Sequence, residues 1–411
     1  MPLREDAAAI AGQLAELRHA IHREPEIGLD LPRTQEKVLA ALDGLPLEVT
    51  TGKTLSSVTA VLRGGARPGS ADGARPSVLL RGDMDALPVT ELTGLLPYAS
   101  RFDGVMHACG HDQHTAMLAG AARLLSGRRD ELPGDVIFMF QPGEEGYNGA
   151  SRMIGEGVLE AAGGPGTRPV AAYALHVSSA QLPCGVFATR PGPMLAAADI
   201  IRVTVRGRGG HASQPHRSAD PIPAACEMVT ALQTMVARQF DVFDPVVVTV
   251  GSFHAGTTDN VIPDEAHFLG TARSYSAASR ARLRTASMRL VNEIAMAHGL
   301  TADAEYVEEY PVTVNDAGEA AFAARTAAEV FGPGRSVPAD HPMTGAEDFS
   351  FVLEQVPGAF VSVGACPPDR DPETAPSNHS AAALFDDAAL ADGAALYAEL
   401  AHRRLAAPAA S

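Results

Sequence analysis

The N-terminal part of the chain alternates between apolar residues at helical spacing and short continuous apolar runs. Apolar positions that recur about every 3.6 residues predict helices, and short apolar runs predict strands. The expected helices cover 6–23, 34–42 and 111–125, and the expected strands cover 58–62, 78–80, 136–140 and 170–175. Strands that alternate with helices favour an α/β domain with a mixed, largely parallel sheet and helices on both faces.

The pattern changes near residue 195. Residues 199–205 alternate between apolar and polar positions, as in a strand with one buried face. The dipeptide Asp220-Pro221 is typical of a helix start. Two more strands are expected in DPVVVTVGSFHAG and EAHFLGTARS, followed by a helix over 276–298 that ends at Gly299. We interpret this order as β-α-β-β-α-β, the ferredoxin-like α+β pattern.

The C-terminal part of the chain returns to the first pattern. Helices are expected over 316–330, 346–355 and 386–405, with a strand over 359–364. The ferredoxin-like domain is therefore expected at 195–310, inserted between 1–194 and 311–411, which together would form the α/β domain.

The chain is strongly acidic. Its 411 residues include 32 Lys and Arg against 49 Asp and Glu, a formal net charge of −17. Such a chain repels phosphate backbones and anionic lipid, so neither nucleic acid nor a membrane is an expected partner. The N-terminus lacks the apolar core of a secretory signal, and no run of about 18 apolar residues occurs, so we expect a cytoplasmic protein. Its four cysteines form no CxxC pair, which argues against a zinc ribbon and fits a reducing compartment.

Side chains that can bind metal follow three of the predicted strands. SVLL leads into Asp83 and Asp85, VIFMF leads into Glu144 and Glu145, and VAAYAL leads into His176. Ligand sites in open α/β sheets form at the carboxyl ends of strands, so we expect these side chains to converge. Taken singly, each is more simply explained as a helix cap or a solvated surface group.

Two other segments contribute further ligand types. MHACGHDQHTAM holds Cys109 and His111 just before a predicted helix, and SNHS holds His379. Imidazole, thiolate and carboxylate together suit Zn, Mn, Co or Ni. The adjacent carboxylates Glu144 and Glu145 point in different directions, so one can bind metal while the other takes a proton from a metal-bound water, whose pKa is lowered to about 7.

The residues of MHACGHDQHTAM allow other interpretations. Cys109 is also a candidate nucleophile with His111 or His114 as its base, half of a disulfide, or part of an ordinary helix start. Acidic neighbours raise a thiol pKa whereas a metal deprotonates the thiol, and a cytoplasmic location disfavours a disulfide, so we favour metal ligation. His114 and Asp112 are expected to support the ligands or cap the helix.

A glycine-rich motif, GRGGHA at 207–212, matches the dinucleotide-binding pattern GxGxxA in form. Pro215 interrupts it and the next helix is expected only near residue 220, so the required strand–turn–helix context is missing. We prefer a loop that presents His211 to an active site.

Eight motifs occur in an order that resembles a known family. They are LLRGDMDALPVTE, MHACGHDQHTAM, FQPGEEGYNGASRMIGEGVLE, ALHVSS, GRGGHASQPHRSADPI, TTDNVIPDEAHFLGTARS, TGAEDFS and SNHS. From about residue 10 to about residue 400, the chain resembles the metal-dependent amidohydrolases of the aminoacylase and carboxypeptidase family, the peptidase M20 type. It is most similar to the subgroup of hippurate hydrolases, N-acyl-amino-acid amidohydrolases and indole-acetyl-amino-acid hydrolases.

The resemblance implies a catalytic domain with two divalent metal ions per subunit and an inserted ferredoxin-like lid or dimerisation domain. It also implies a homodimer, or a higher homo-oligomer, formed through that lid. The implied metal ligands are Cys109, His111, Glu145, His176 and His379.

The resemblance assigns further roles to single residues. Glu144 corresponds to the general base, and Asp85 to the aspartate that orients a metal-site residue. His211 corresponds to the lid histidine that polarises the scissile carbonyl, in dimers often from the partner subunit. Asn260 and Arg273 lie in lid motifs that resemble those contacting the substrate, including its carboxylate.

The implied activity is hydrolysis of N-acyl or N-aroyl amino acids to a carboxylic acid and a free amino acid, through a metal-bound water activated by Glu144. Asp83 stands where many relatives have histidine, and Cys109 where many have aspartate, so the wider family does not specify the metal here. The subgroup shares both changes. The alternative functions are a non-catalytic metal-binding protein on the same scaffold and a thiol hydrolase that uses Cys109.

Overall fold

The computed structural model describes residues 3–66, 75–92, 96–163 and 168–407. The chain divides into two compact units, each described by itself below. Unit 1 consists of Met1–Met194, Val314–Asp340 and Phe351–Ser411, and unit 2 consists of Leu195–Thr313 and His341–Ser350. The segment 341–350, which we expected in the α/β domain, therefore belongs to unit 2.

Unit 1 is built on an eight-stranded sheet with the order β1-β2-β4-β3-β5-β16-β6-β15. The four central strands, β4, β3, β5 and β16, are parallel to one another, whereas β2 and β6 run antiparallel to their central neighbours. The expected mixed, largely parallel sheet is confirmed. The strands are β1 (Leu47–Thr51), β2 (Val58–Leu62), β3 (Ser77–Asp83), β4 (Asp135–Gln141), β5 (Ala171–Pro183), β6 (Phe187–Thr189), β15 (Ser336–Pro338) and β16 (Gly358–Cys366).

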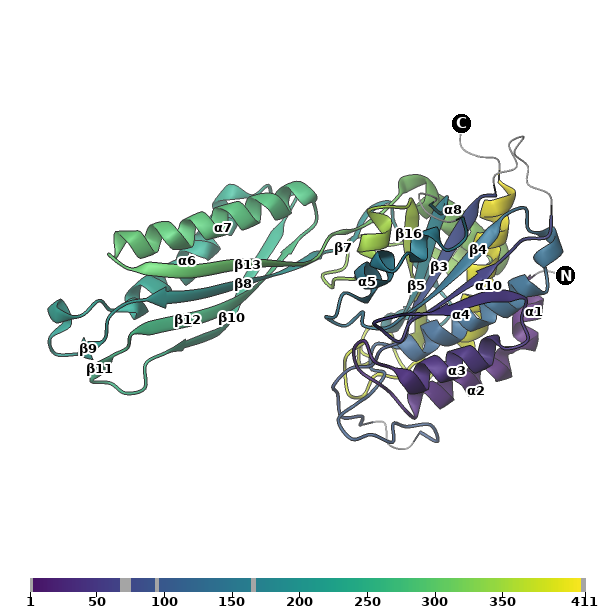
Figure 1. Ribbon diagram of the computed structural model, residues 1–411, viewed down its shortest axis with the longest axis horizontal. Helices are drawn as coiled ribbons and strands as arrows, with labels where there is room; N and C mark the ends of the chain where they lie inside the picture. Colours follow the sequence, from purple (N-terminus) through teal and green to yellow (C-terminus); the bar gives the residue numbers. More distant parts are fainter. Residues whose placement is uncertain (1–2, 67–74, 93–95, 164–167, 408–411) are drawn as a thin grey trace. The chain divides into compact units, whose positions relative to one another are not determined.

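The central strands of this sheet are covered on both faces. Every residue of β3, β4 and β16 is buried, as expected for parallel strands packed on two sides. Helices α4 and α10 pack on β3 and β5, and α8 packs on β16 and β6 (Figure 1). The helices of unit 1 are α1 (Leu3–Ala9), α2 (Ala11–His22), α3 (Pro32–Leu42), α4 (His111–Ser126), α5 (Gly149–Gly155), α8 (Ala317–Phe331) and α10 (Ala388–Ala406).

Some predicted elements differ from those in the structure. The single helix expected over 6–23 is two helices, because the backbone of Ile10 leaves the helical conformation at ψ 4°. The helix expected over 346–355 shrinks to α9 (Ser350–Leu353). Glu347 accepts the backbone N–H of Phe349 (2.9 Å) and so favours a turn where the helix was expected to start.

Unit 2 is a four-stranded antiparallel sheet with the order β10-β12-β8-β13, and α6 and α7 lie on one of its faces (Figure 1). Asp220 and Ser276 cap the two helices by accepting N–H groups of the first turn, and Gly299 adopts φ +68° after α7. The elements are β8 (Ala197–Arg206), α6 (Pro221–Gln239), β10 (Val246–Ala255), β12 (Glu265–Ser274), α7 (Ala277–Ala297) and β13 (Thr301–Tyr310). Their order is the expected ferredoxin-like β-α-β-β-α-β.

Two short strand pairs complete the description. β9 (Gly210–His211) pairs with β11 (Val261–Ile262) in unit 2, so the glycine-rich motif forms a small ribbon and opens no helix. β7 (Gly192–Leu195) and β14 (Thr313–Asn315) lie where the chain passes between the units. Across the described ranges, none of the helices is long and apolar enough to cross a membrane.

Candidate metal centre

The predicted ligands of unit 1 meet at one edge of its sheet. β3 ends at Asp83, β4 ends just before the turn that carries Glu144 and Glu145, and His176 lies within β5. β3 pairs in parallel with both β4 and β5, so the carboxyl ends of these strands are neighbours. This topology brings together side chains that are far apart in the sequence.

Asp85 organises the turn after β4. Its two carboxylate oxygens accept the backbone N–H groups of Glu144 and Glu145, each at 3.0 Å. The same carboxylate lies 3.5 Å from Nδ1 of His111. Asp85 therefore fixes the two glutamates relative to the start of α4, although it lies on a different segment from both.

Gly110 sets the direction of the two ligands that precede and begin α4. Its φ is +86°, a left-handed conformation that glycine adopts without steric cost. A Cβ at this position would lie 2.4 Å from Cγ2 of Val177, so the loop lies directly against β5. Cys109 and His111 thereby flank a backbone position that other residues cannot occupy without strain.

Cys109 lies at the centre of a group of ligand atoms. Its Sγ is 3.4 Å from Nε2 of His176 and 3.3 Å from Nε2 of His379, and the same His379 nitrogen is 3.2 Å from Oε1 of Glu145. The ligand atoms within each of three overlapping triads lie within 4.8 Å of one another. The triads are Cys109–His111–His176, Cys109–Glu145–His379 and His111–Glu144–Glu145.

The hydrogen bonds of two histidines determine which ring nitrogens are open. Nδ1–H of His176 donates to the carbonyl of Val177 (2.9 Å), which leaves Nε2 facing Cys109. His114 accepts the backbone N–H of Val177 at Nε2 (2.8 Å) and donates from Nδ1 to Asp83 (2.5 Å). His114 has no nitrogen left for a metal, so it acts as a support for the ligands, as we expected.

His111 provides the test of whether a cation fits this site. The residue is fully buried, and neither ring nitrogen makes a hydrogen bond within the described part of the chain. Carboxylate oxygens of Asp85, Asp83 and Glu144 lie 3.5, 3.7 and 4.0 Å from its nitrogens. Buried polar groups are almost always partnered, so an unpartnered imidazole among carboxylates fits a divalent cation.

Asp83 lies beside His111, but both of its oxygens are bonded to other groups. One oxygen of Asp83 accepts a hydrogen bond from Nδ1 of His114, and the other accepts one from the guanidinium of Arg81. Arg81 is itself fully buried and also donates to Gln141 (2.9 Å). Asp83 reaches the ends of the strands, as its position after SVLL predicts. Its two oxygens are already occupied by protein donors, so it supports the site electrostatically.

The charges of these groups favour a cation in place of protons. Burial lowers the pKa of His176 well below its usual value, so this imidazole is neutral. Burial also opposes protonation of His111, but the interactions with Asp83 and Cys109 outweigh it and raise the pKa of His111 well above the usual value. Hydrogen bonds to Cys109 and Glu145 raise the pKa of His379 to about 10. In the metal-free protein at neutral pH, His111 and His379 therefore carry protons that a metal must displace.

The predicted substrate-contacting residues lie in unit 2. His211 is exposed on β9, and its Nδ1 accepts the backbone N–H of Ser213 (3.2 Å). Asn260 is also exposed. The carbonyl of Asn260 accepts the backbone N–H of Ala212 (3.1 Å), so Asn260 lies beside His211. Arg273 lies near the other end of the unit on β12 and donates to Oγ1 of Thr271 (2.6 Å). Unit 2 thus brings His211 and Asn260 together and keeps Arg273 apart from them.

A second layer of buried residues behind α4 was missed by sequence reasoning. Asp112 does not cap the helix; its Oδ2 accepts from Nε of Arg18 and lies 2.9 Å from Nδ1 of His22. Burial opposes ionisation of Asp112, but Arg18 and His22 outweigh it and hold its pKa well below the usual range. The available signal was the spacing of Arg18 and His22, which continue the apolar face of α2 at i, i+4 from Leu14.

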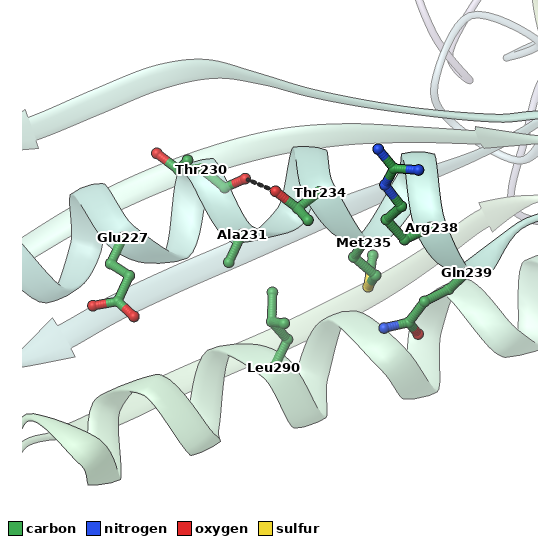
Figure 2. A pocket seen from close by; sticks show the side chains of 8 residues that line it. All are labelled: Glu227, Thr230, Ala231, Thr234, Met235, Arg238, Gln239 and Leu290. Carbon is green, nitrogen blue, oxygen red and sulfur yellow. Dashed lines mark hydrogen bonds between the residues drawn. The ribbon is translucent and has the colours of Figure 1, made fainter.

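Unit 2 also carries a groove of about 350 Å³ between α6 and α7 (Figure 2). Its only charged side chains, Glu227 and Arg238, are exposed, and Thr234 donates to the carbonyl of Thr230 (3.3 Å). The lining residues are Glu227, Thr230, Ala231, Thr234, Met235, Arg238, Gln239 and Leu290. None of the predicted site residues lines this groove.

Comparison with known proteins relates the whole chain to one family. The model of Peptidase family M20/M25/M40 matches residues 79–403. Thermostable carboxypeptidase 2 of Saccharolobus solfataricus is 36% identical over 402 residues, covering 97% of each chain. IAA-amino acid hydrolase ILR1-like 4 of Arabidopsis thaliana is 36% identical and covers 95% of this chain and 85% of its own. N-acetylcysteine deacetylase of Bacillus subtilis is 35% identical, covering 95% of this chain and 96% of its own.

Solved structures give the same relationship. A putative aminohydrolase from methicillin resistant Staphylococcus aureus is 30% identical with a TM-score of 0.89, covering 98% of this chain and 99% of its own. The YXEP protein of Bacillus subtilis, described as a dinuclear metal binding peptidase from the M20 family, is 31% identical with a TM-score of 0.80. It covers 97% of this chain and 99% of its own.

Replacing Gly110 with alanine should destabilise unit 1 by about 2–4 kcal/mol, because a left-handed backbone and a clash with Val177 act together. Gly104 has a similar φ of +77° but open space around its Cβ position. Gly104→Ala therefore isolates the backbone penalty, about 1 kcal/mol. Thermal and urea unfolding measure both losses. Equal losses at the two positions would contradict the close packing of Gly110 against β5.

Zinc binding at pH 7 should release about two protons from the imidazoles, because His111 and His379 have raised pKa values in the metal-free protein. Metal affinity should consequently rise as the pH increases from about 6 to 8. Calorimetric titration in buffers of different ionisation enthalpy counts the protons. His379→Ala should release about one proton fewer; an unchanged count would contradict the assignment.

Proposed function

The chain belongs to peptidase family M20/M25/M40, and we propose that it hydrolyses the amide bond of N-acyl or N-aroyl amino acids to a carboxylic acid and a free amino acid. The observation that carries this proposal is the position of Glu144. Its buried carboxylate lies beside the unpartnered His111 and is adjacent to Glu145 at the edge of the sheet. The relatives named as a deacetylase and as an IAA-amino acid hydrolase support this substrate class.

Five side chains would hold the metal ions, and together they supply thiolate, imidazole and carboxylate donors. When bound, two divalent ions such as Zn, Mn, Co or Ni supply Lewis-acid polarisation and make a nearby water acidic near neutral pH. The relative described as a dinuclear metal binding peptidase supports two ions. The proposed ligands are Cys109, His111, Glu145, His176 and His379.

Glu144 is the proposed general base. Its Oε2 takes a proton from the attacking water and later returns it to the nitrogen of the leaving amine. Asp85 accepts the backbone N–H of Glu144, which fixes the turn that carries the Glu144 side chain. A buried position beside His111 keeps this carboxylate from being fully hydrated, which strengthens its interaction with the reacting water.

His211 is the proposed donor to the carbonyl oxygen of the scissile amide. Because Nδ1 accepts the N–H of Ser213, the neutral ring carries its proton on Nε2. The exposed Nε2–H is then free to donate to the oxyanion that develops during attack. Arg273 is the proposed partner of the substrate carboxylate, and Asn260 a neighbouring polar contact.

The separation of these groups within unit 2 supports a homodimer. Gly209 donates to Asp264 (2.8 Å), which places β9 beside the start of β12. Arg273 lies near the other end of β12, roughly 26 Å further along at about 3.3 Å per residue. An N-acyl amino acid is too short to span that distance. We therefore propose that a substrate held by Arg273 of one copy meets His211 of another, through an assembly formed by unit 2.

Glu144→Gln should lower kcat by about 10²- to 10⁴-fold and leave the metal content unchanged, because it removes the base and keeps the fold. Glu145→Gln is the matched control and should lose metal. Hydrolysis of N-acetyl, N-benzoyl and indole-acetyl amino acids with added Zn, Mn, Co or Ni, together with elemental analysis, measures both. Wild-type rates in Glu144→Gln would rule out its role. Iodoacetamide inactivation that is independent of metal would favour the thiol hydrolase.

Co-expression of His211→Ala with Glu144→Gln tests whether the site is shared. Each variant alone should be slowed by about 10²-fold or more. In a random mixture half of the dimers are mixed and each has one intact site, so activity should return to about a quarter of wild type. Hydrolysis that stays at the level of the single variants would show that His211 acts within its own chain.

A further inference from the structure

Asn378 makes four hydrogen bonds to nitrogen and oxygen atoms that join separate parts of the metal centre, and its Nδ2 also lies 3.9 Å from Sγ of Cys109. Its Nδ2 donates to the carbonyl of Cys109 (3.0 Å) and to that of Val177 (2.9 Å). Its Oδ1 accepts the backbone N–H of Ser179 (2.9 Å) and the hydroxyl of the same residue (3.1 Å). Both amide hydrogens are thus used, and the hydroxyl of Ser179 is shared between Oδ1 and the carbonyl of Pro376 (2.9 Å).

These bonds connect three of the segments that carry proposed ligands, those of Cys109, His176 and His379. Cys109 is bonded directly, and His176 is reached through the carbonyl of Val177, which accepts both its Nδ1–H and the amide of Asn378. His379 is the next residue in the chain. Three ligands from three distant segments therefore depend on one neutral side chain for their relative positions.

The backbone of His379 needs such a restraint. Its φ is +70°, one of three positive values among the described residues other than glycine. Left-handed backbone costs an L-residue roughly 1–2 kcal/mol and persists only where the surroundings hold it. The N–H of His379 donates to the carbonyl of Ala108 (2.8 Å), and the bonds of Asn378 hold the preceding residue.

We propose that Asn378 is a positioning residue that holds Cys109, His176 and His379 in the arrangement in which they bind metal. The inference rests on the proposed function, because it presumes that these three side chains are ligands. Only asparagine fits the position: aspartate has no donors for the carbonyls of Cys109 and Val177, and glutamine is longer by one methylene. Asn378 itself touches no reacting atom.

The test measures Co²⁺ binding to the metal-free full-length protein, together with the absorption band of cobalt–thiolate ligation. Asn378→Ala should weaken Co²⁺ binding about 10- to 100-fold, the usual effect of removing a residue that orients ligands. Asn378→Asp has the same shape and should lose at least as much, since its carboxylate repels the two carbonyls. The thiolate band should weaken in both variants.

Asn315 offers a matched control in the same unit. Its amide also makes four hydrogen bonds, to Thr189, Arg190 and both backbone groups of Phe360, but it contacts none of the proposed ligands. Asn315→Ala should lower the melting temperature and leave Co²⁺ affinity at the wild-type value. A purely structural role for Asn378 would make the two alanine variants behave alike.

Each outcome distinguishes this inference from the proposed function. Wild-type Co²⁺ affinity and an intact thiolate band in Asn378→Asp would overturn the positioning role while the hydrolase remains. Asn378→Asp also decides the question if Asn378→Ala does not fold. A wild-type protein that bound no Co²⁺ would overturn the proposed function and this inference with it.

Discussion

A buried imidazole without a hydrogen-bond partner is the constraint on which the rest of unit 1 depends. His111 is fully enclosed, and the carboxylates of Asp83, Asp85 and Glu144 surround it at ion-pair distance. An unpartnered buried polar group costs on the order of 1–3 kcal/mol, and buried carboxylates without a compensating charge cost more. A divalent cation removes both costs together. The arrangement of His111 and the carboxylates around it is therefore the one expected of a cation-binding site.

The carboxylates of Asp83 and Asp85 are held by other groups and do not form hydrogen bonds with His111. Asp83 is bonded to Arg81 and His114, and Asp85 to the backbone of the glutamate turn. These bonds hold the carboxylates at fixed positions beside His111, where they attract a cation. Because the restraints come from β3, β4 and α4 at once, the donor atoms are arranged before any ligand binds, which lowers the entropy cost of binding.

The two units divide the proposed chemistry according to the kind of structure each has. Unit 1 buries Asp83, Asp85, His111 and Glu144, and a buried carboxylate such as Glu144 responds strongly to nearby charge, whereas His379 is exposed. Unit 2 presents His211 on an exposed two-stranded ribbon, supported by a rigid antiparallel sheet. Exposed donors suit a substrate that must enter and leave. In the proposed dimer, the fixed separation of His211 from Arg273 makes each site depend on two copies.

The sequence by itself determined the order of the central strands and of the main helices, and the strand ends that carry the predicted ligands, because these are local patterns of apolar runs followed by polar residues. Tertiary structure alone decided which oxygens and nitrogens remain open: Asp83 is occupied by partners from other segments, whereas His111 is left without any. Tertiary structure also decided that segment 341–350 belongs to unit 2. It likewise decided that Asn378 bonds to the carbonyls of Cys109 and Val177. Such outcomes depend on contacts between residues that are distant along the chain, and no local pattern encodes them.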